Sequence, residues 1–197
     1  KGSHMRVVVF DLDGTLIYSA PDIHSAINLT LANEGAAPLD LPTLVSFIGN
    51  GLPKLVERTM QARGIDFSQH ARLTEATLAH YGSAATLNTK LYPHVAVALD
   101  ALKQAGMTLG LCTNKPEAPA RTILRDLMLE RFFDVVIGGD TLPSRKPDPA
   151  PLHACFQRLG ATQSLFVGDS EVDAETARRA DTAFALFSGG YRKSPVS

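Results

Sequence analysis

Short apolar runs alternate with helix-like stretches over much of this 197-residue chain, and that alternation restricts the possible folds more than any other feature. The apolar runs are too short for helices and are bounded by turn residues, as buried strands are. They cover residues 6–10, 108–113, 135–138, 164–167 and 183–186, with helix-like stretches at 116–129, 149–159 and 171–180. Strands joined by helices form parallel sheets covered on both faces. The pattern predicts a three-layer, Rossmann-like α/β sheet with residues 6–10 near its centre.

Residues 19–90 follow a different pattern. Apolar side chains recur there at helical spacing, without a convincing strand, and Gly35, Gly64 and Gly82 stand near expected helix ends. A crossover between parallel strands usually needs only one helix, so a stretch of this length predicts an inserted small helical bundle. We therefore expect a tag remnant from expression at residues 1–5, an α/β core domain at 6–18 and 91–197, and a helical domain at 19–90.

The composition excludes several kinds of partner. Charged residues make up 20% of the chain, the formal net charge is −1 and no basic stripe stands out, so nucleic acid and membrane surfaces are poor partners. No apolar run approaches the roughly 20 residues that a membrane-spanning helix needs. Cys112 and Cys155 lack a metal-type or redox-type spacing, and we interpret them as reduced core thiols of a cytoplasmic protein.

Polar side chains gather where the predicted strands end. They are Asp11 and Asp13, then Thr113, Asn114 and Lys115, then Lys146 before a helix, and finally Asp169 and Ser170 with Asp173. The carboxyl ends of parallel strands share one edge of the sheet, so these segments should converge on one pocket. Two carboxylates as close as Asp11 and Asp13 repel unless a cation or a shared proton relieves them. This arrangement suggests a metal site, a nucleophile with an acid partner, or both.

These residue types suit phosphoryl transfer. One carboxylate can attack phosphorus, and a second carboxyl can protonate the leaving oxygen and later activate water. Hydroxyl and backbone N–H groups can hold phosphoryl oxygens, a lysine can neutralise their charge, and clustered carboxylates suit Mg²⁺. Taken singly, the aspartates and Thr113 could instead cap helices, and Lys146 could be an ordinary solvated lysine.

In their order along the chain, the segments resemble the four motifs of the haloacid dehalogenase superfamily of phosphatases. Residues 11–15 match the first motif, Thr113 the second, Lys146 the third, and residues 168–170 with Asp173 the fourth. The resemblance implies that Asp11 is the nucleophile and Asp13 the acid and base. It also implies that Thr113 and the Asn114 backbone bind phosphate and that Lys146 bridges the phosphoryl group and Asp11.

The same resemblance implies a magnesium ion and a mobile cap. Mg²⁺ would be held by the Asp11 side chain, the Asp13 carbonyl and Asp169, with Asp173 in support. Residues 19–90 would close over the site, exclude water and select the substrate. Asn50 and Gly51 would contact the part of the substrate beyond the phosphate, although residues 49–51 could equally be an ordinary turn between helices.

Further stretches resemble phosphoglycolate phosphatases, namely residues 19–22, 47–51, 113–116, 138–140, 145–149 and 189–191. The implied reaction is Mg²⁺-dependent hydrolysis of a small phosphate ester, 2-phosphoglycolate, to glycolate and phosphate through an aspartyl-phosphate. The enzyme would be a monomer or a homodimer. Alternatives are a phosphatase for another small metabolite and a β-phosphoglucomutase-like sugar-phosphate mutase. Asp13 argues against a dehalogenase, and the complete set of motifs argues against a binding protein without activity.

Overall fold

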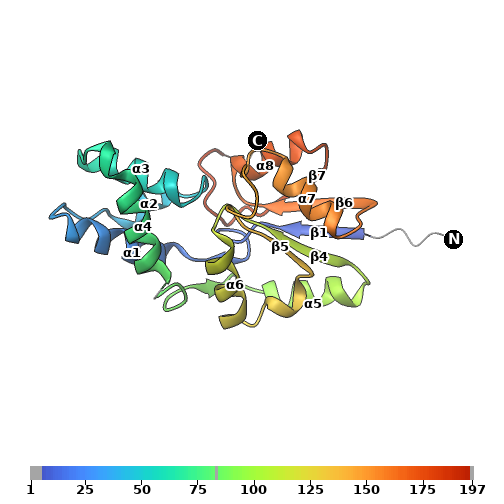
Figure 1. Cartoon of the computed structure of the whole chain (residues 1–197). Coiled ribbons are helices and arrows are strands. Elements are labelled where there is room, and N and C mark those ends of the chain that lie inside the picture. The colour runs from blue at the N-terminus through green and yellow to red at the C-terminus, as the bar shows by residue number, and fades with distance from the viewer. Residues whose placement is uncertain (1–5, 83, 196–197) are drawn as a thin grey trace.

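The computed structural model describes residues 6–82 and 84–195, so the predicted tag remnant at residues 1–5 lies outside the described part. Within it, five parallel strands form the central sheet in the order β5-β4-β1-β6-β7 (Figure 1). Their bounds are β1 Arg6–Phe10, β4 Thr108–Cys112, β5 Val135–Ile137, β6 Gln163–Gly168 and β7 Ala183–Leu186. In β1, Val9 pairs with Gly110 of β4 on one side and with Phe166 of β6 on the other. The predicted parallel sheet and the central place of residues 6–10 are confirmed.

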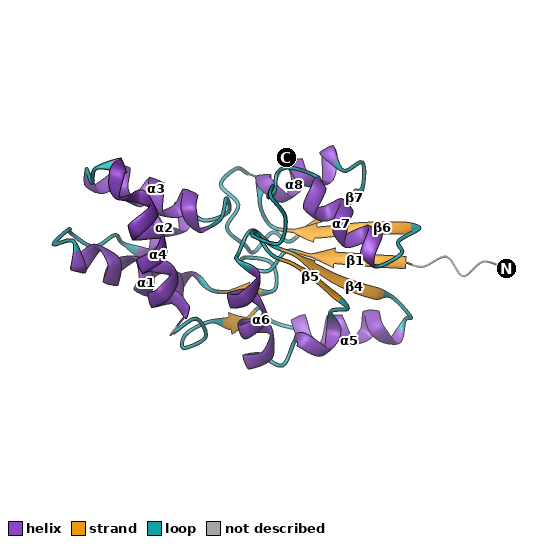
Figure 2. Cartoon of the chain, viewed as in Figure 1, coloured by secondary structure: helices purple, strands orange, loops and turns teal. Residues whose placement is uncertain are grey.

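Helices cover both faces of this sheet, as Figure 2 shows. Successive side chains of a strand point to opposite faces, and four of the five residues of β1 are apolar, so it contributes to two apolar clusters. Val8 packs in the cluster that contains Leu99 and Ile123, and Val9 packs in the cluster that contains Leu152. The helices that supply these clusters are α5 (Val95–Gln104) and α6 (Glu117–Asp126) on one face, and α7 (Ala150–Arg158) and α8 (Glu171–Arg179) on the other.

The predicted helices within residues 19–90 are present and lie beyond the carboxyl ends of the strands (Figure 2). They are α1 Ala20–Asn33, α2 Leu41–Phe47, α3 Leu52–Arg63 and α4 His70–Gly82, with a short 3-10 helix at Phe67–Gln69. Asp40 begins α2 by accepting a hydrogen bond from the Thr43 N–H (2.7 Å), and α3 ends at Gly64 with a left-handed φ of 64°. Helices α1 and α3 both pack on α4.

Two local features differ from the sequence prediction. A small antiparallel sheet joins β2 (Ile17–Tyr18) to β3 (Lys90–Leu91), at the two connections between the helical segment and the main sheet. Strands of two residues are too short to show a periodicity, so the sequence analysis missed them. Helix α6 ends at Asp126 rather than at residue 129, because Met128 adopts a left-handed φ of 57°. A 3-10 helix follows at Glu130–Phe132.

Candidate active site

Segments far apart in the sequence meet at the carboxyl edge of the sheet. The Lys146 ammonium lies 2.9 Å from Asp11 Oδ1 and 2.6 Å from Asp173 Oδ1, which joins the end of β1, the loop before α7 and the start of α8. Thr113, at the end of β4, lines the same cavity as Asp11 and Asp169. The structure therefore brings together the residues that the sequence analysis placed in one pocket.

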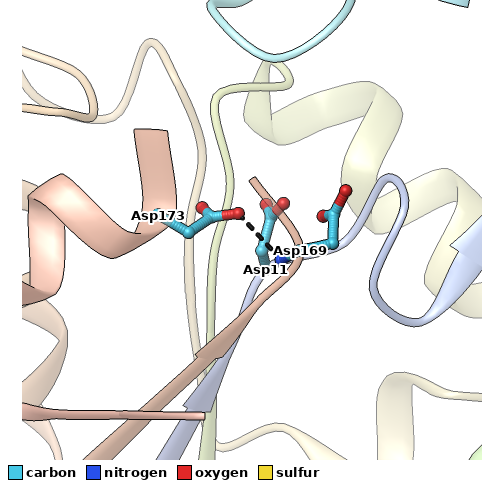
Figure 3. A group of neighbouring side chains, drawn as sticks. All are labelled: Asp11, Asp169 and Asp173. Atoms are coloured by element: carbon cyan, nitrogen blue, oxygen red, sulfur yellow. Dashed lines mark hydrogen bonds between the residues drawn. The ribbon is translucent and has the colours of Figure 1, made fainter. Parts of the chain in front are cut away.

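Asp11, Asp169 and Asp173 form a cluster of buried carboxylates in which the closest set of oxygens lies within 4.8 Å of one another. Figure 3 shows that the three side chains come from different places: Asp11 directly follows β1, Asp169 directly follows β6, and Asp173 lies in the first turn of α8. Burial and the neighbouring Asp173 raise the pKa of Asp11 well above its usual value, although Lys146 opposes this. Burial and Asp173 also raise the pKa of Asp169, to about 6. When the three carboxylates are ionised they repel one another, and the positive charge of Lys146 alone does not balance their negative charge.

A divalent oxygen-seeking cation fits this donor set. If all three carboxylates are ionised, the single ammonium of Lys146 leaves a net charge of two negative units on the cluster. Buried carboxylate oxygens that converge without a balancing charge are the ligands that Mg²⁺ prefers. A bound cation would also lower the pKa of Asp11 and keep it ionised.

Two hydrogen bonds and a close glycine fix the orientation of the Asp169 carboxylate. Its Oδ1 accepts a hydrogen bond from the Thr15 hydroxyl (2.8 Å), and its Oδ2 accepts one from the Tyr191 N–H (2.7 Å). Gly14, with φ of +84°, approaches so closely that a Cβ there would stand 2.4 Å from Asp169 Oδ2. The glycine of the first motif is therefore required both by its left-handed backbone and by this approach.

Asp13 lies apart from the carboxylate cluster. Its Oδ1 forms an ion pair with the Lys115 ammonium (3.0 Å) and accepts a hydrogen bond from the Ser19 hydroxyl. The structure thus separates its side chain from Asp11, Asp169 and Asp173. The predicted metal contact of Asp13, through its backbone carbonyl, stays a prediction.

Lys115 is the functional candidate to which the sequence analysis assigned no role. Its side chain is buried, and its ammonium contacts both Asp13 and the hydroxyl of Tyr81 on α4. Burial alone would lower the pKa of this lysine, but Asp13 and Tyr81 outweigh burial and raise it, so the side chain stays charged. The only sequence signal was its position directly after Thr113 and Asn114 at the end of a strand.

Asn114 links three parts of the site through its side-chain amide. Its Nδ2 donates to the Lys146 carbonyl (2.9 Å) and to the Gly49 carbonyl (3.2 Å), and its Oδ1 accepts from the Lys146 N–H (2.9 Å). The side chain therefore holds the Lys146 loop and the loop before α3 in place. Phosphate binding by the Asn114 backbone, as the sequence analysis expected, stays a prediction.

Asn50 and Gly51, the two residues expected to contact the substrate from the cap, lie in different places. Gly51 lines the cavity together with Asp11 and Asp13, and a Cβ at Gly51 would lie 3.2 Å from the Asn114 carbonyl oxygen. Asn50 does not line this cavity among the described residues. Its side-chain oxygen accepts a hydrogen bond from Arg58 (2.9 Å), and both residues line a separate hollow that Lys146 also lines. The structure therefore places Gly51 at the cavity and Asn50 at the neighbouring hollow, and contact of either residue with a substrate stays a prediction.

Both cysteines are free and buried, as expected for core thiols. Burial raises the pKa of Cys112 to about 12, so its thiol stays protonated near neutral pH and is a poor nucleophile. In the part of the chain that the structure describes, none of the helices has the length and apolar character to cross a membrane.

The sequence profile of the haloacid dehalogenase-like hydrolase family matches residues 8–187. A phosphoglycolate phosphatase from Cereibacter sphaeroides is 51% identical over 194 residues, which cover 98% of this chain and 89% of that protein. A phosphoglycolate phosphatase from Rhodospirillum rubrum is 43% identical, covering 98% of this chain and 83% of that one. The crystal structure of a predicted phosphoglycolate phosphatase from Haemophilus somnus matches with a TM-score of 0.90 at 31% identity, over 96% of this chain and 88% of that chain. This chain therefore belongs to the haloacid dehalogenase-like hydrolase family, among its phosphoglycolate phosphatase-like enzymes.

Proposed function

We propose that this enzyme is a Mg²⁺-dependent phosphatase that hydrolyses 2-phosphoglycolate to glycolate and phosphate through an aspartyl-phosphate on Asp11. The observation that carries the proposal is the placement of two carboxylates with different partners at one cavity. Asp11 contacts Lys146 within the carboxylate cluster, whereas Asp13 contacts Lys115. Groups with such different surroundings can take different parts in one reaction. The names of the relatives support the choice of substrate.

In the first half of the reaction, the Asp11 carboxylate attacks the phosphorus atom as the ester bond breaks. Asp13 gives a proton to the leaving ester oxygen, and glycolate departs. In the second half, Asp13 takes a proton from a water molecule that attacks the same phosphorus atom. The bond between Asp11 and phosphorus breaks, phosphate leaves, and Asp13 regains its proton.

Lys146 and Thr113 are proposed to bind the phosphoryl oxygens with the backbone at Asn114. Lys146 already contacts Asp11, so it can neutralise charge on the phosphoryl group and on the nucleophile together. Asp11, Asp169 and the Asp13 carbonyl would hold Mg²⁺, with Asp173 in support. When bound, the ion supplies positive charge that stabilises the developing charge on the phosphoryl oxygens.

We propose that residues 19–90 act as the cap over this site, since helices α1, α3 and α4, together with Gly51, line the same cavity as Asp11. The cavity volume is about 80 Å³, where roughly 10–15 Å³ holds one water molecule, so it suits a small substrate. Free buried Cys112 and Cys155 are compatible with a reducing cytoplasm, and we keep monomer or homodimer as the expected state.

Phosphate release from a panel of monoesters, with MgCl₂ or with EDTA, tests this function. We expect the highest kcat/KM for 2-phosphoglycolate, loss of activity in EDTA and recovery on adding Mg²⁺. The nucleophile variant Asp11→Asn should lose activity by several orders of magnitude. Activity that persists in Asp11→Asn, or conversion of a sugar 1-phosphate to its 6-phosphate, would contradict the proposal.

A further inference from the structure

The cavity between the sheet edge and α1–α4 has one basic side chain among its described lining residues. That side chain is Lys115, and it is 5% exposed. The part of the lining that α1, α3 and α4 supply is largely apolar, with Ile23, Leu52, Leu55 and Leu78. A negatively charged group entering such a cavity needs a charged or hydrogen-bonding partner, because burial without one is costly. Lys115 is therefore where an anionic group beyond the phosphate can be accommodated.

Lys146 and Arg58, two other cations near the cavity, have different partners, and a third, Arg145, lies beside Gly51 and lines the separate hollow. Lys146 lies between Asp11 and Asp173, at 2.9 and 2.6 Å. Arg58 donates to the Phe47 carbonyl (2.8 Å) and to Asn50 Oδ1 (2.9 Å), and it faces the separate hollow. Neither Lys146 nor Arg58 is placed to meet the carbon end of a substrate whose phosphate lies at Asp11.

Lys115 still has donor capacity. An ammonium group carries three N–H donors, and two acceptors are recorded for it among the described residues, Asp13 and the Tyr81 hydroxyl. The ammonium lies 4.3 Å from the centre of the Tyr81 ring. Since the Tyr81 oxygen accepts from Lys115, its own O–H is oriented by that contact and can donate to a ligand oxygen. Together the two side chains offer a pair of donors to a carboxylate.

We propose that Lys115, together with the Tyr81 hydroxyl, binds the carboxylate of the substrate and selects phosphorylated acids with two carbons. This rests on the proposed phosphatase function. In 2-phosphoglycolate the carboxylate and the ester oxygen are attached to the same carbon atom. Because Lys115 also contacts Asp13, a carboxylate held there places the ester oxygen beside the acid that protonates it. A longer acid would move that oxygen away from Asp13.

The subsite is shared between the core and the helical segment. Lys115 follows β4, whereas Tyr81 lies near the end of α4. Recognition of the carboxylate is therefore complete only when α4 lies against the loop after β4. Binding of the substrate carboxylate would therefore favour the closed arrangement, in which α4 lies against the loop after β4.

The test compares 2-phosphoglycolate with ethyl phosphate, which has the same chain length and no carboxylate. In Lys115→Met, kcat/KM should fall on both substrates, since Lys115 also contacts Asp13. It should fall roughly 10- to 100-fold further on 2-phosphoglycolate, the factor that a hydrogen bond between charged groups is worth. Tyr81→Phe should shift the ratio in the same direction by a smaller factor. Lys103→Met, which removes an exposed lysine paired with Asp134, is the matched control.

Each outcome decides the proposal. Equal losses on both substrates in a variant that keeps the wild-type circular dichroism spectrum would show that Lys115 acts only through Asp13, and would overturn the subsite. If the wild type prefers a phosphorylated acid with a longer carbon chain, the proposed selection of two-carbon acids is overturned, while the phosphatase reaction stands. If the wild type shows no preference for any acid over ethyl phosphate, the subsite is overturned while the phosphatase reaction stands.

Discussion

Asp11 and Asp13 are two positions apart in the chain, yet their side chains lie in different surroundings. Asp11 is held by Lys146 among other carboxylates, and Asp13 is held by Lys115 and Ser19. Leu12 between them is fully buried and fixes the backbone that separates the two side chains. At the scale of single residues, these different partners are compatible with the separate roles that we propose for the two carboxylates.

The variant Asp13→Asn tests this division, because the amide keeps the shape and cannot supply the proton. We expect turnover of 2-phosphoglycolate to fall about 10²- to 10⁴-fold, the usual contribution of general acid catalysis. Hydrolysis of p-nitrophenyl phosphate should fall much less, because nitrophenolate leaves without protonation. Initial rates on both substrates measure the effect, with Asp100→Asn on the exposed side of α5 as control. A loss of equal size on both substrates would contradict the acid role of Asp13.

At the scale of elements, the turn between β6 and α8 both starts a helix and builds the carboxylate cluster. Ser170 and Asp173 form a reciprocal capping box at the start of α8. The same Asp173 carboxylate uses its other oxygen to contact Lys146, and its Oδ2 accepts from the Asp169 N–H (3.1 Å). Helix formation therefore fixes the position of a charged group in the site.

This turn should make the stability of the protein depend on pH and on Mg²⁺. The pKa of Asp169 is about 6 in the folded chain without a cation, against about 4 in an unfolded chain. The folded state therefore binds this proton more tightly. The contribution of this proton to stability is fully present below pH about 4. It is lost as the pH rises through about 6, which lowers the free energy of unfolding by about 2–3 kcal/mol. Asp11, whose pKa is also raised, adds in the same direction.

Urea unfolding in EDTA should therefore show a falling free energy of unfolding between pH 4 and pH 6. Mg²⁺ should restore stability above pH 6, because the ion binds carboxylates only after they lose their protons. In Asp169→Asn, the part of the pH dependence that comes from this residue should disappear. Unfolding curves that coincide in EDTA and in Mg²⁺ at pH 7 would be incompatible with a cation site here.

At the scale of the whole molecule, two connections join helices α1–α4 to the sheet, and one residue links them. Asp22, buried in the first turn of α1, accepts hydrogen bonds from the N–H groups of Asn88 (2.9 Å) and Thr89 (2.7 Å) just before β3. The Thr89 hydroxyl donates to it as well (2.7 Å). Asp22 therefore joins the segment that enters the helical region to the segment that leaves it, close to β2 and β3.

Asp22→Ala should loosen this junction without touching the cavity. The buried N–H of Thr89 would lose its acceptor, whereas the N–H of the exposed Asn88 could bond to water instead, so we expect a loss of about 1–3 kcal/mol in the free energy of unfolding. Limited proteolysis should cut faster between α4 and β3, and kcat/KM should fall. Asp40→Ala, which removes the N-cap of α2, should cost about 1 kcal/mol and leave the junction intact. Wild-type cleavage rates in Asp22→Ala would refute this account of the junction.

The sheet, the inserted helices and three carboxylates of the cluster could be predicted from the sequence, although Asp13 was expected among them and pairs with Lys115 instead. Local periodicity reports which side chains are buried, and the order of strands along the chain brings their carboxyl ends to one edge. For this reason the sequence pattern alone predicts residues 6–10 at the centre of the sheet and Asp11, Lys146 and Asp169 at one site. The glycines near helix ends carried similar local information, as Gly64 shows.

Which polar groups are partners follows from the packing of distant segments and cannot be predicted from local sequence. The contact of Lys115 with Asp13 and Tyr81 depends on how α4 packs against the loop after β4, and no local pattern records that distance. The same holds for Asn50, which turns to Arg58 instead of the cavity, and for the two-residue strands β2 and β3. The tendency of a side chain to be buried follows from its own chemistry. Its hydrogen-bond partner, in contrast, depends on segments that meet only after the chain has folded.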